Sequence, residues 1–412
     1  MNKISVLAAG VSAAVLGASA FAAAPARKVE SKAPPPIATY WMDVSTTSGF
    51  GAGMMGGGRP NMSQVMAMMN GGGGSVAHSL ELRLSSREKP TGAPQAQHFI
   101  PAGLDMGASL PLVTPEMVRA VEAHGSSEPG SYEKPKGRML IYWGCGEHAG
   151  ANQPQVIDFA KMSEGQMPEN LRALTKMAQM MGRMSAREPT ADNSPGFGEW
   201  PNQRDSRAVP AAGSLIGAHR VEANYAPPIA FSLGEGQDFM PGLGLHEAGT
   251  MPSGADNLMW RQAAQATGYA LAMFGQGRGG DVVIWTSAKS ASLAPAFDYL
   301  SPSEVKHLVV SGAVLPPSTS QCTLPAEVAS AVPQGMVMGI GYGPEAYFSD
   351  SPRVPKWGVR VRYKTTAMLM RGMGAMTGGD EGGQASDQPQ AQPQPQKKRG
   401  GLLGGILSSI PH

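Results

Sequence analysis

Strict alternation of apolar and polar side chains over residues 76–85 limits the fold of this chain more than any other feature. Apolar side chains dominate one parity and polar ones the other. The first set is Val76, His78, Leu80, Leu82 and Leu84, and the second is Ala77, Ser79, Glu81, Arg83 and Ser85. A two-residue repeat is that of a β-strand with one solvated face. Because antiparallel sheets accommodate such strands, the segment predicts an antiparallel β architecture.

Further β-strands are predicted along most of the chain. Residues 138–143 (RMLIYW) form a continuous apolar run, which is typical of a strand buried on both faces. Other predicted strands cover residues 38–45, 215–225, 229–233, 260–274, 282–287, 336–342 and 357–366. The segment 260–274 is long and rich in alanine, so a helix remains an alternative there. The turn Gly275–Gly280 joins it to residues 282–287 as a hairpin.

Helices are expected to be few and short. One is predicted to open at Thr114-Pro115-Glu116, and another covers residues 168–184. Ser301 and Glu304 have the spacing of a capping box, which predicts a third. Many short strands and few helices favour a mainly β protein built of two antiparallel β-sandwich-like units.

Composition divides the chain into segments. It contains 54 glycines and 35 prolines, which indicates folded parts interrupted by irregular ones. The first β-rich domain is expected over residues 37–184, with a Gly/Met-rich loop at 49–74. A linker at 185–208 precedes a second β-rich domain at 209–372, and a disordered Gly/Gln/Pro tail covers 373–412. Residues 137–143 resemble residues 280–285, which is compatible with duplication or with chance.

The N-terminus has the pattern of a secretory signal peptide. Lys3 precedes an uncharged Ala/Val/Leu run, and Ala20-Phe21-Ala22 offers small residues at a cleavage site. The run is shorter than the roughly 20 strongly apolar residues that span a bilayer. We therefore expect cleavage near Ala22 and a periplasmic or secreted mature chain with no transmembrane span.

Charge argues against nucleic acid as a partner. The formal net charge is +2, and charged residues make up only 16% of the chain. Nucleic-acid binding usually depends on a clustered basic surface. In residues 357–364, Arg360, Arg362 and Lys364 share one parity, which we interpret as a solvated sheet surface rather than an anion site.

The two cysteines allow three interpretations. In an oxidising compartment Cys145 and Cys322 would form one disulfide, and otherwise they are two separate buried thiols. Cys145 and His148 also have the residue types of a nucleophile and its base, although no signature of a cysteine hydrolase surrounds them. A metal site that adds His246 and Glu247 has suitable ligand types but no diagnostic spacing.

Methionine is the most unusual residue type, with 27 copies. One cluster lies in the Gly-rich loop and comprises Met54, Met55, Met62, Met66, Met68 and Met69. Thioether sulfur is a soft ligand that selects Cu(I), so this cluster is the candidate metal site. A second cluster, Met177, Met180, Met181 and Met184, has helical spacing and is better explained as core packing.

The C-terminus predicts a peripheral contact. Lys397, Lys398 and Arg399 precede a short apolar segment that ends at Ile410. Such a segment can lie on an anionic membrane or dock in a partner's groove, and the bland alternative is a frayed end.

The function most consistent with these patterns is an exported cell-envelope protein with a non-catalytic binding or structural role and no cofactor. Its partner is an unknown envelope protein or the membrane surface reached by residues 397–410. The alternatives are a methionine-rich periplasmic protein that binds Cu(I) and an enzyme that depends on Cys145 and His148. The Gly275–Gly280 segment matches GxGxxG in letters, but a strand follows it where a dinucleotide site needs a helix.

Overall fold

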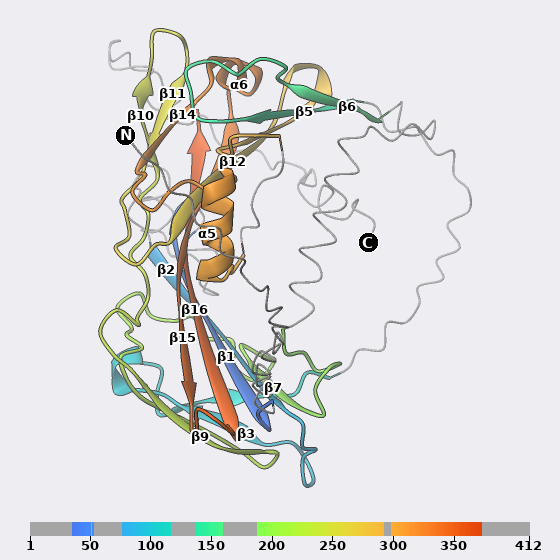
Figure 1. Ribbon diagram of the computed structural model, residues 1–412, viewed down its shortest axis with the longest axis vertical. Helices are drawn as coiled ribbons and strands as arrows, with labels where there is room; N and C mark the ends of the chain where they lie inside the picture. The colour runs from blue at the N-terminus through green and yellow to red at the C-terminus, as the bar shows by residue number, and fades with distance from the viewer. Residues whose placement is uncertain are drawn as a thin grey trace, which may run out of the picture.

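The computed structural model describes residues 35–50, 52, 76–116, 137–159, 188–291 and 298–372. Within these ranges the protein is mainly β, with three sheets and few helices (Figure 1). This confirms the expectation of a mainly β protein with few helices. The predicted signal peptide, most of the 49–74 loop, the 168–184 helix and the 373–412 tail lie outside the described residues. Among the residues described, no helix is both long and apolar enough to cross a membrane.

The largest sheet has nine strands in the order β6-β5-β13-β12-β15-β16-β1-β2-β7. Its strands are antiparallel to their neighbours except at β1/β16 and β13/β5, which are parallel. The bounds are β1 (Ala38–Gly49), β2 (Val76–Ser86), β5 (Arg138–Trp143), β6 (Gln155–Asp158), β7 (Gly196–Trp200), β12 (Gly268–Gln276), β13 (Val282–Thr286), β15 (Gly335–Ser349) and β16 (Trp357–Arg371).

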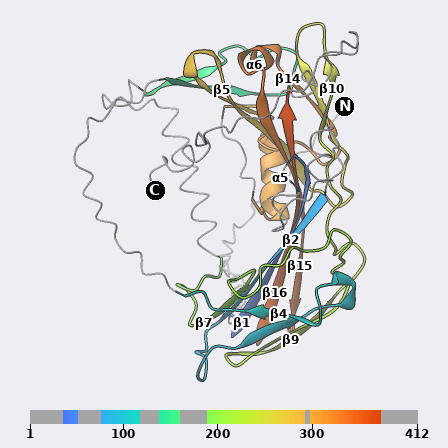
Figure 2. The same ribbon diagram turned by 180° about the vertical axis from the view of Figure 1, so that it is seen from behind.

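Two smaller sheets lie at opposite ends of the large one (Figures 1 and 2). The four-stranded sheet has the order β4 (Ser109–Leu112), β3 (Ala96–Phe99), β8 (Gly217–Ala223) and β9 (Ala226–Leu233). The three-stranded sheet has the order β10 (His246–Thr250), β11 (Asp256–Met259) and β14 (Gln321–Leu324). The helices are α5 (Pro302–Ser311), α6 (Ala326–Ala331) and the 3-10 turns η1 (Ala102–Leu104) and η2 (Arg278–Gly280).

The two halves of the chain build one sheet rather than two separate units. β1, from the predicted first domain, lies between β2 and β16, and β16 belongs to the predicted second domain. β5 and β13, whose sequences resemble each other, are also neighbours. Strand patterns predict which segments are extended but not which strand pairs with which, and this is why the division at residue 185 does not separate the sheets.

The linker expected over residues 185–208 is wrong at its centre, where residues 196–200 form the edge strand β7. The glycines of this strand allow close packing. A Cβ atom on Gly196 or Gly198 would lie 2.6 Å from the side chain of Tyr225. Tyr225 is buried against this strand, so the glycines are required by the packing of a ring rather than by chain flexibility.

The two faces of the large sheet differ. The inner face, defined by Tyr40 and Met42 of β1, packs against the four-stranded sheet in the main core. The outer face is defined by Trp41 and Asp43 of β1 and the even-numbered residues of β16. Helix α5 covers its middle, where a second cluster joins Ala270, Leu300, Val305, Val314, Ile340 and Tyr342 (Figure 1).

Predictions of secondary structure are confirmed where a short sequence pattern determines the structure. The alternation at 76–85 is confirmed by β2, and the hairpin by the antiparallel pairing of β12 with β13. The Ser301 capping box is present, with the Glu304 side chain accepting from the Ser301 amide at 2.8 Å. Residues 260–267 are neither strand nor helix, since β12 begins only at Gly268. Residues 114–116 have no regular structure, and those after them lie outside the described ranges.

Candidate functional site

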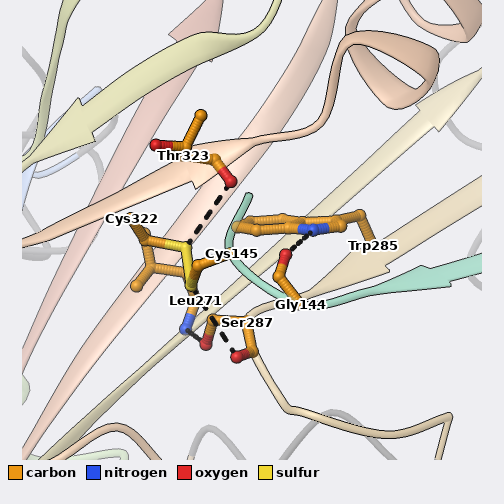
Figure 3. Close-up of a disulfide and its surroundings, with 7 residues drawn as sticks. All are labelled: Gly144, Cys145, Leu271, Trp285, Ser287, Cys322 and Thr323. Atoms are coloured by element: carbon orange, nitrogen blue, oxygen red, sulfur yellow. Dashed lines mark hydrogen bonds between the residues drawn. A yellow bond between two sulfur atoms is a disulfide. The ribbon is translucent and has the colours of Figure 1, made fainter. Parts of the chain in front are cut away.

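The disulfide Cys145–Cys322 joins the large sheet to the three-stranded sheet (Figure 3). The two sulfurs are 2.08 Å apart and the Cα atoms 5.1 Å apart. Next to the bridge, Trp285 Nε1 donates to the carbonyl of Gly144 at 2.9 Å, and the Gly146 amide donates to the Thr323 carbonyl at 3.0 Å. The disulfide interpretation of the two cysteines is therefore the one the structure contains.

The bridge occupies the sulfur that a cysteine nucleophile would need. His148 instead pairs through Nδ1 with Glu327 Oε1 at 3.0 Å, and both side chains are exposed. The amide of Ala149 donates to the same carboxylate at 2.8 Å, and this hydrogen bond is the main reason that the pKa of Glu327 is lowered. In the bridged protein this loop anchors the first turn of α6 and offers no thiolate.

The four residues considered for a metal site are engaged separately. His246 Nδ1 is 2.9 Å from the carbonyl of Gly244, and Glu247 lies 3.9 Å from the guanidinium of Arg371. Burial raises the pKa of Glu247. Among the residues that the structure describes, no group of three or more His, Cys, Asp or Glu is placed to hold a metal ion.

A buried ionic cluster centres on Asp43, on the outer face of the large sheet. The strand register places Arg362 on one side of Asp43 and Glu81 on the other. Arg362 donates from Nε and Nη2 to the two carboxylate oxygens of Asp43, both at 2.5 Å. Arg83 donates to the same carboxylate at 2.8 Å. Arg362 is 6% exposed, so the expectation of a solvated basic face is wrong at this residue.

Three further residues, Glu188, Trp41 and Tyr299, complete this cluster. Glu188 accepts from Arg362 at 2.7 Å and from Arg83 at 3.3 Å. The Arg362 guanidinium lies 4.7 Å from the centre of the Trp41 ring and 4.7 Å from the centre of the Tyr299 ring. Burial by itself lowers the pKa of Arg362, but the bonds to Asp43 and Glu188 outweigh it and raise the pKa above its ordinary value. All three guanidinium nitrogens of Arg362 donate to carboxylates, so this cation is paired within the fold.

A hydrogen-bonded chain of neutral groups crosses the core between the sheets. His219 Nε2 donates to the Leu215 carbonyl at 2.7 Å, which leaves Nδ1 as an acceptor. His98 Nε2 therefore donates to it at 2.9 Å, and His98 Nδ1 accepts from the Tyr40 hydroxyl at 2.9 Å. Burial lowers the pKa of both histidines, and the neighbouring His219 adds to the effect on His98.

A shallow depression of about 470 Å³ lies beside the end of this chain, on the four-stranded sheet. It is lined mainly by apolar atoms, with His219 and Arg220 as the titratable residues. Both are occupied, because His219 is part of the chain above and Arg220 lies 4.1 Å over the Phe99 ring and pairs with Glu222. The two titratable side chains that line the depression are therefore both already engaged within the protein.

Four methionines form a grid on the outer face of the large sheet, beyond α5. In the antiparallel pair β15/β16, Met336 lies opposite Met370 and Met338 lies opposite Met368. All four are half-buried. Phe274 of β12 is the next residue in the row beside Met336, and its side chain is 37% exposed. We call these four residues the methionine grid.

The grid is a feature that sequence reasoning missed. Its signal was present, since Met336-Val-Met338 and Met368-Leu-Met370 both repeat methionine with the period of a strand. What the sequence does not contain is the register that makes the two repeats face each other. The clusters that sequence reasoning did single out, at 54–69 and 177–184, lie outside the described residues.

Comparisons of the chain with protein-family models, with curated proteins and with solved structures found no match.

Proposed function

We propose that the protein is an exported, non-catalytic binding protein of the cell envelope. The observation that carries the proposal is the disulfide between Cys145 and Cys322. Disulfides persist in oxidising compartments such as the bacterial periplasm and are rare in the cytosol. The predicted signal peptide at residues 1–22 agrees with this location.

A binding role is favoured over catalysis by the state of the reactive groups. The thiol of Cys145 is bonded, and the imidazole of His148 is held by Glu327. The buried histidines His98 and His219 are locked in a neutral chain that ends on a backbone carbonyl. A rigid sheet with a partly exposed apolar surface around Phe274 suits recognition better than proton transfer.

The test is to express the full-length chain with its own leader in a Gram-negative host and to fractionate the cells. We expect periplasmic protein with Ala23 at its N-terminus and an intact mass two hydrogens below that of the reduced chain. Iodoacetamide should label neither cysteine before reduction and both after it. A chain that starts at Ala23 and stays in the cytosol is the control and should contain free thiols. Recovery of the full-length chain in the cytosol, with its leader intact and both thiols reactive, would overturn the proposal.

The proposed partner surface in the envelope is an anionic membrane, reached by residues 397–410. The motivating pattern is the cationic triplet followed by leucines and isoleucines. Flotation with anionic vesicles should carry the mature protein upward, and vesicles of neutral lipid should do so less. If deletion of residues 397–412 leaves flotation unchanged, the tail is not the membrane contact.

A further inference from the structure

We propose that the methionine grid, Met336, Met338, Met368 and Met370, is a binding site for Cu(I). The inference builds on the proposed binding function and names the class of ligand for it. The site consists only of residues on β15 and β16, and it is separate from the methionine-rich loop that the sequence suggested.

The first argument is geometric. Residues directly opposite in an antiparallel pair have Cβ atoms roughly 4.5–5.5 Å apart. Residues two apart on one strand are separated by about 7 Å and point to the same face. The pairs Met336/Met370 and Met338/Met368 therefore place four Cβ atoms at the corners of a small rectangle on one face. A methionine side chain has three rotatable bonds, so several of these sulfurs can reach one ion above the rectangle.

The second argument is that these methionines are not part of the core. Core methionines of this protein are almost fully buried. Each is at most 4% exposed and belongs to the main hydrophobic cluster, and they are Met42, Met106, Met240 and Met273. Among the described residues, neither hydrophobic cluster includes a member of the grid, even as a partly buried neighbour. The cluster under α5 includes Ile340 of β15. Met338 is the neighbouring residue on the same face of that strand and does not belong to the cluster.

The third argument is chemical. A thioether is neutral and soft, so it binds Cu(I) in preference to hard cations such as Mg²⁺ or Ca²⁺. It carries no proton at any working pH, and binding therefore needs no deprotonation and no neighbouring base. Phe274 of β12, an apolar side chain, lies beside Met336 in the same row of the sheet. The metal stays Cu(I) throughout, so no oxidant or reductant takes part.

The ladder of β15 and β16 also supplies preorganisation. The two strands pair continuously from Gly335/Arg371 to Tyr342/Lys364, so the four backbone positions are fixed before the metal arrives. A site whose backbone is already fixed loses less backbone conformational entropy on binding than one whose backbone must be ordered. This favours the grid over a loop with the same number of sulfurs.

The experiment is an anaerobic competition titration of the mature, disulfide-bonded protein against a chromophoric Cu(I) chelator. We expect one Cu(I) per chain. The variant M336L/M338L/M368L/M370L keeps side-chain volume nearly constant and should lose this binding. The pair variant M336L/M370L should bind roughly tenfold more weakly, which corresponds to about 1.4 kcal/mol. The control M251L/M259L replaces two half-buried methionines outside the grid and should bind as the parent does.

A second measurement uses the unsubstituted protein and so does not depend on how the variants fold. Hydrogen peroxide converts accessible methionines to sulfoxides, which peptide mass spectrometry counts residue by residue. Ag(I), a redox-inert soft analogue, should slow oxidation at Met336, Met338, Met368 and Met370 and leave Met251 and Met259 unaffected.

Retention of tight binding by the four-leucine variant would place the metal elsewhere, including at residues 54–69, and would overturn the inference. Equal oxidation of the grid with and without Ag(I) would do the same. These results are independent of the export test, because an exported and bridged protein that binds no Cu(I) leaves the proposed function standing and removes only its ligand.

Discussion

Asp43 offers the most demanding test of the fold, because two buried or half-buried cations depend on one carboxylate. Its side chain is 1% exposed, and it receives two hydrogen bonds from Arg362 and one from Arg83. The variant D43N keeps the shape of the side chain and removes its charge. Arg362 and Arg83 then face each other across a neutral amide.

The expected loss of unfolding free energy in D43N depends on the hydrogen bonds that Arg362 and Arg83 keep. Removing one partner of a buried ion pair destabilises a protein by about 3–5 kcal/mol. Glu188 still accepts from both Arg362 and Arg83, so the loss should lie near the lower end, at about 3 kcal/mol. The matched control is E81Q in the same cluster. Glu81 is 49% exposed, and among the described residues its ion pair is with Arg83, so its loss should cost less than about 1 kcal/mol.

Urea unfolding monitored by tryptophan fluorescence measures both variants, provided that their m-values agree with that of the parent. The double variant D43N/R362Q should lose less than the sum of the two single variants, because the pair is energetically coupled. If D43N shifts the free energy of unfolding no more than E81Q does, Asp43 is not the centre of the cluster and the assignment fails.

Three further predictions concern the core and the bridge. Burial lowers the pKa of His98 and His219 below the ordinary 6.5, so their contribution to stability is intact above that pH. Below it the free energy of unfolding should fall by up to about 1.4 kcal/mol per pH unit for each histidine. A urea midpoint that stays the same from about pH 6.5 to 5.5 would contradict this. Y40F leaves Nδ1 of His98 without its donor and should cost about 1–3 kcal/mol in the same assay, whereas an unchanged midpoint would show that the hydroxyl does not support the chain. Replacing Cys145 and Cys322 by alanine opens a bridge across 177 residues and should cost roughly 5 kcal/mol on the chain-entropy account; identical midpoints for the oxidised and reduced parent would refute it.

Local patterns determined much of the secondary structure. The two-residue alternation at 76–85, the glycine turn after β12 and the Ser301–Glu304 spacing each involve contacts within a few residues, and each is present as expected. The exceptions have a non-local cause. Gly196 and Gly198 were interpreted as linker residues because the ring that requires them, that of Tyr225, is more than 25 residues away in the chain.

The sequence by itself also determined that the protein is mainly β, because strand periodicity is a property of consecutive residues. Only the tertiary structure decided that both halves share one sheet and that Arg362 is buried against Asp43, 319 residues away. The tertiary structure also decided that Met336 lies opposite Met370 and Met338 opposite Met368. The physical reason is common to these cases: a side-chain pattern assigns residues to the faces of a strand, whereas strand order, register and the cover over each face depend on long-range packing.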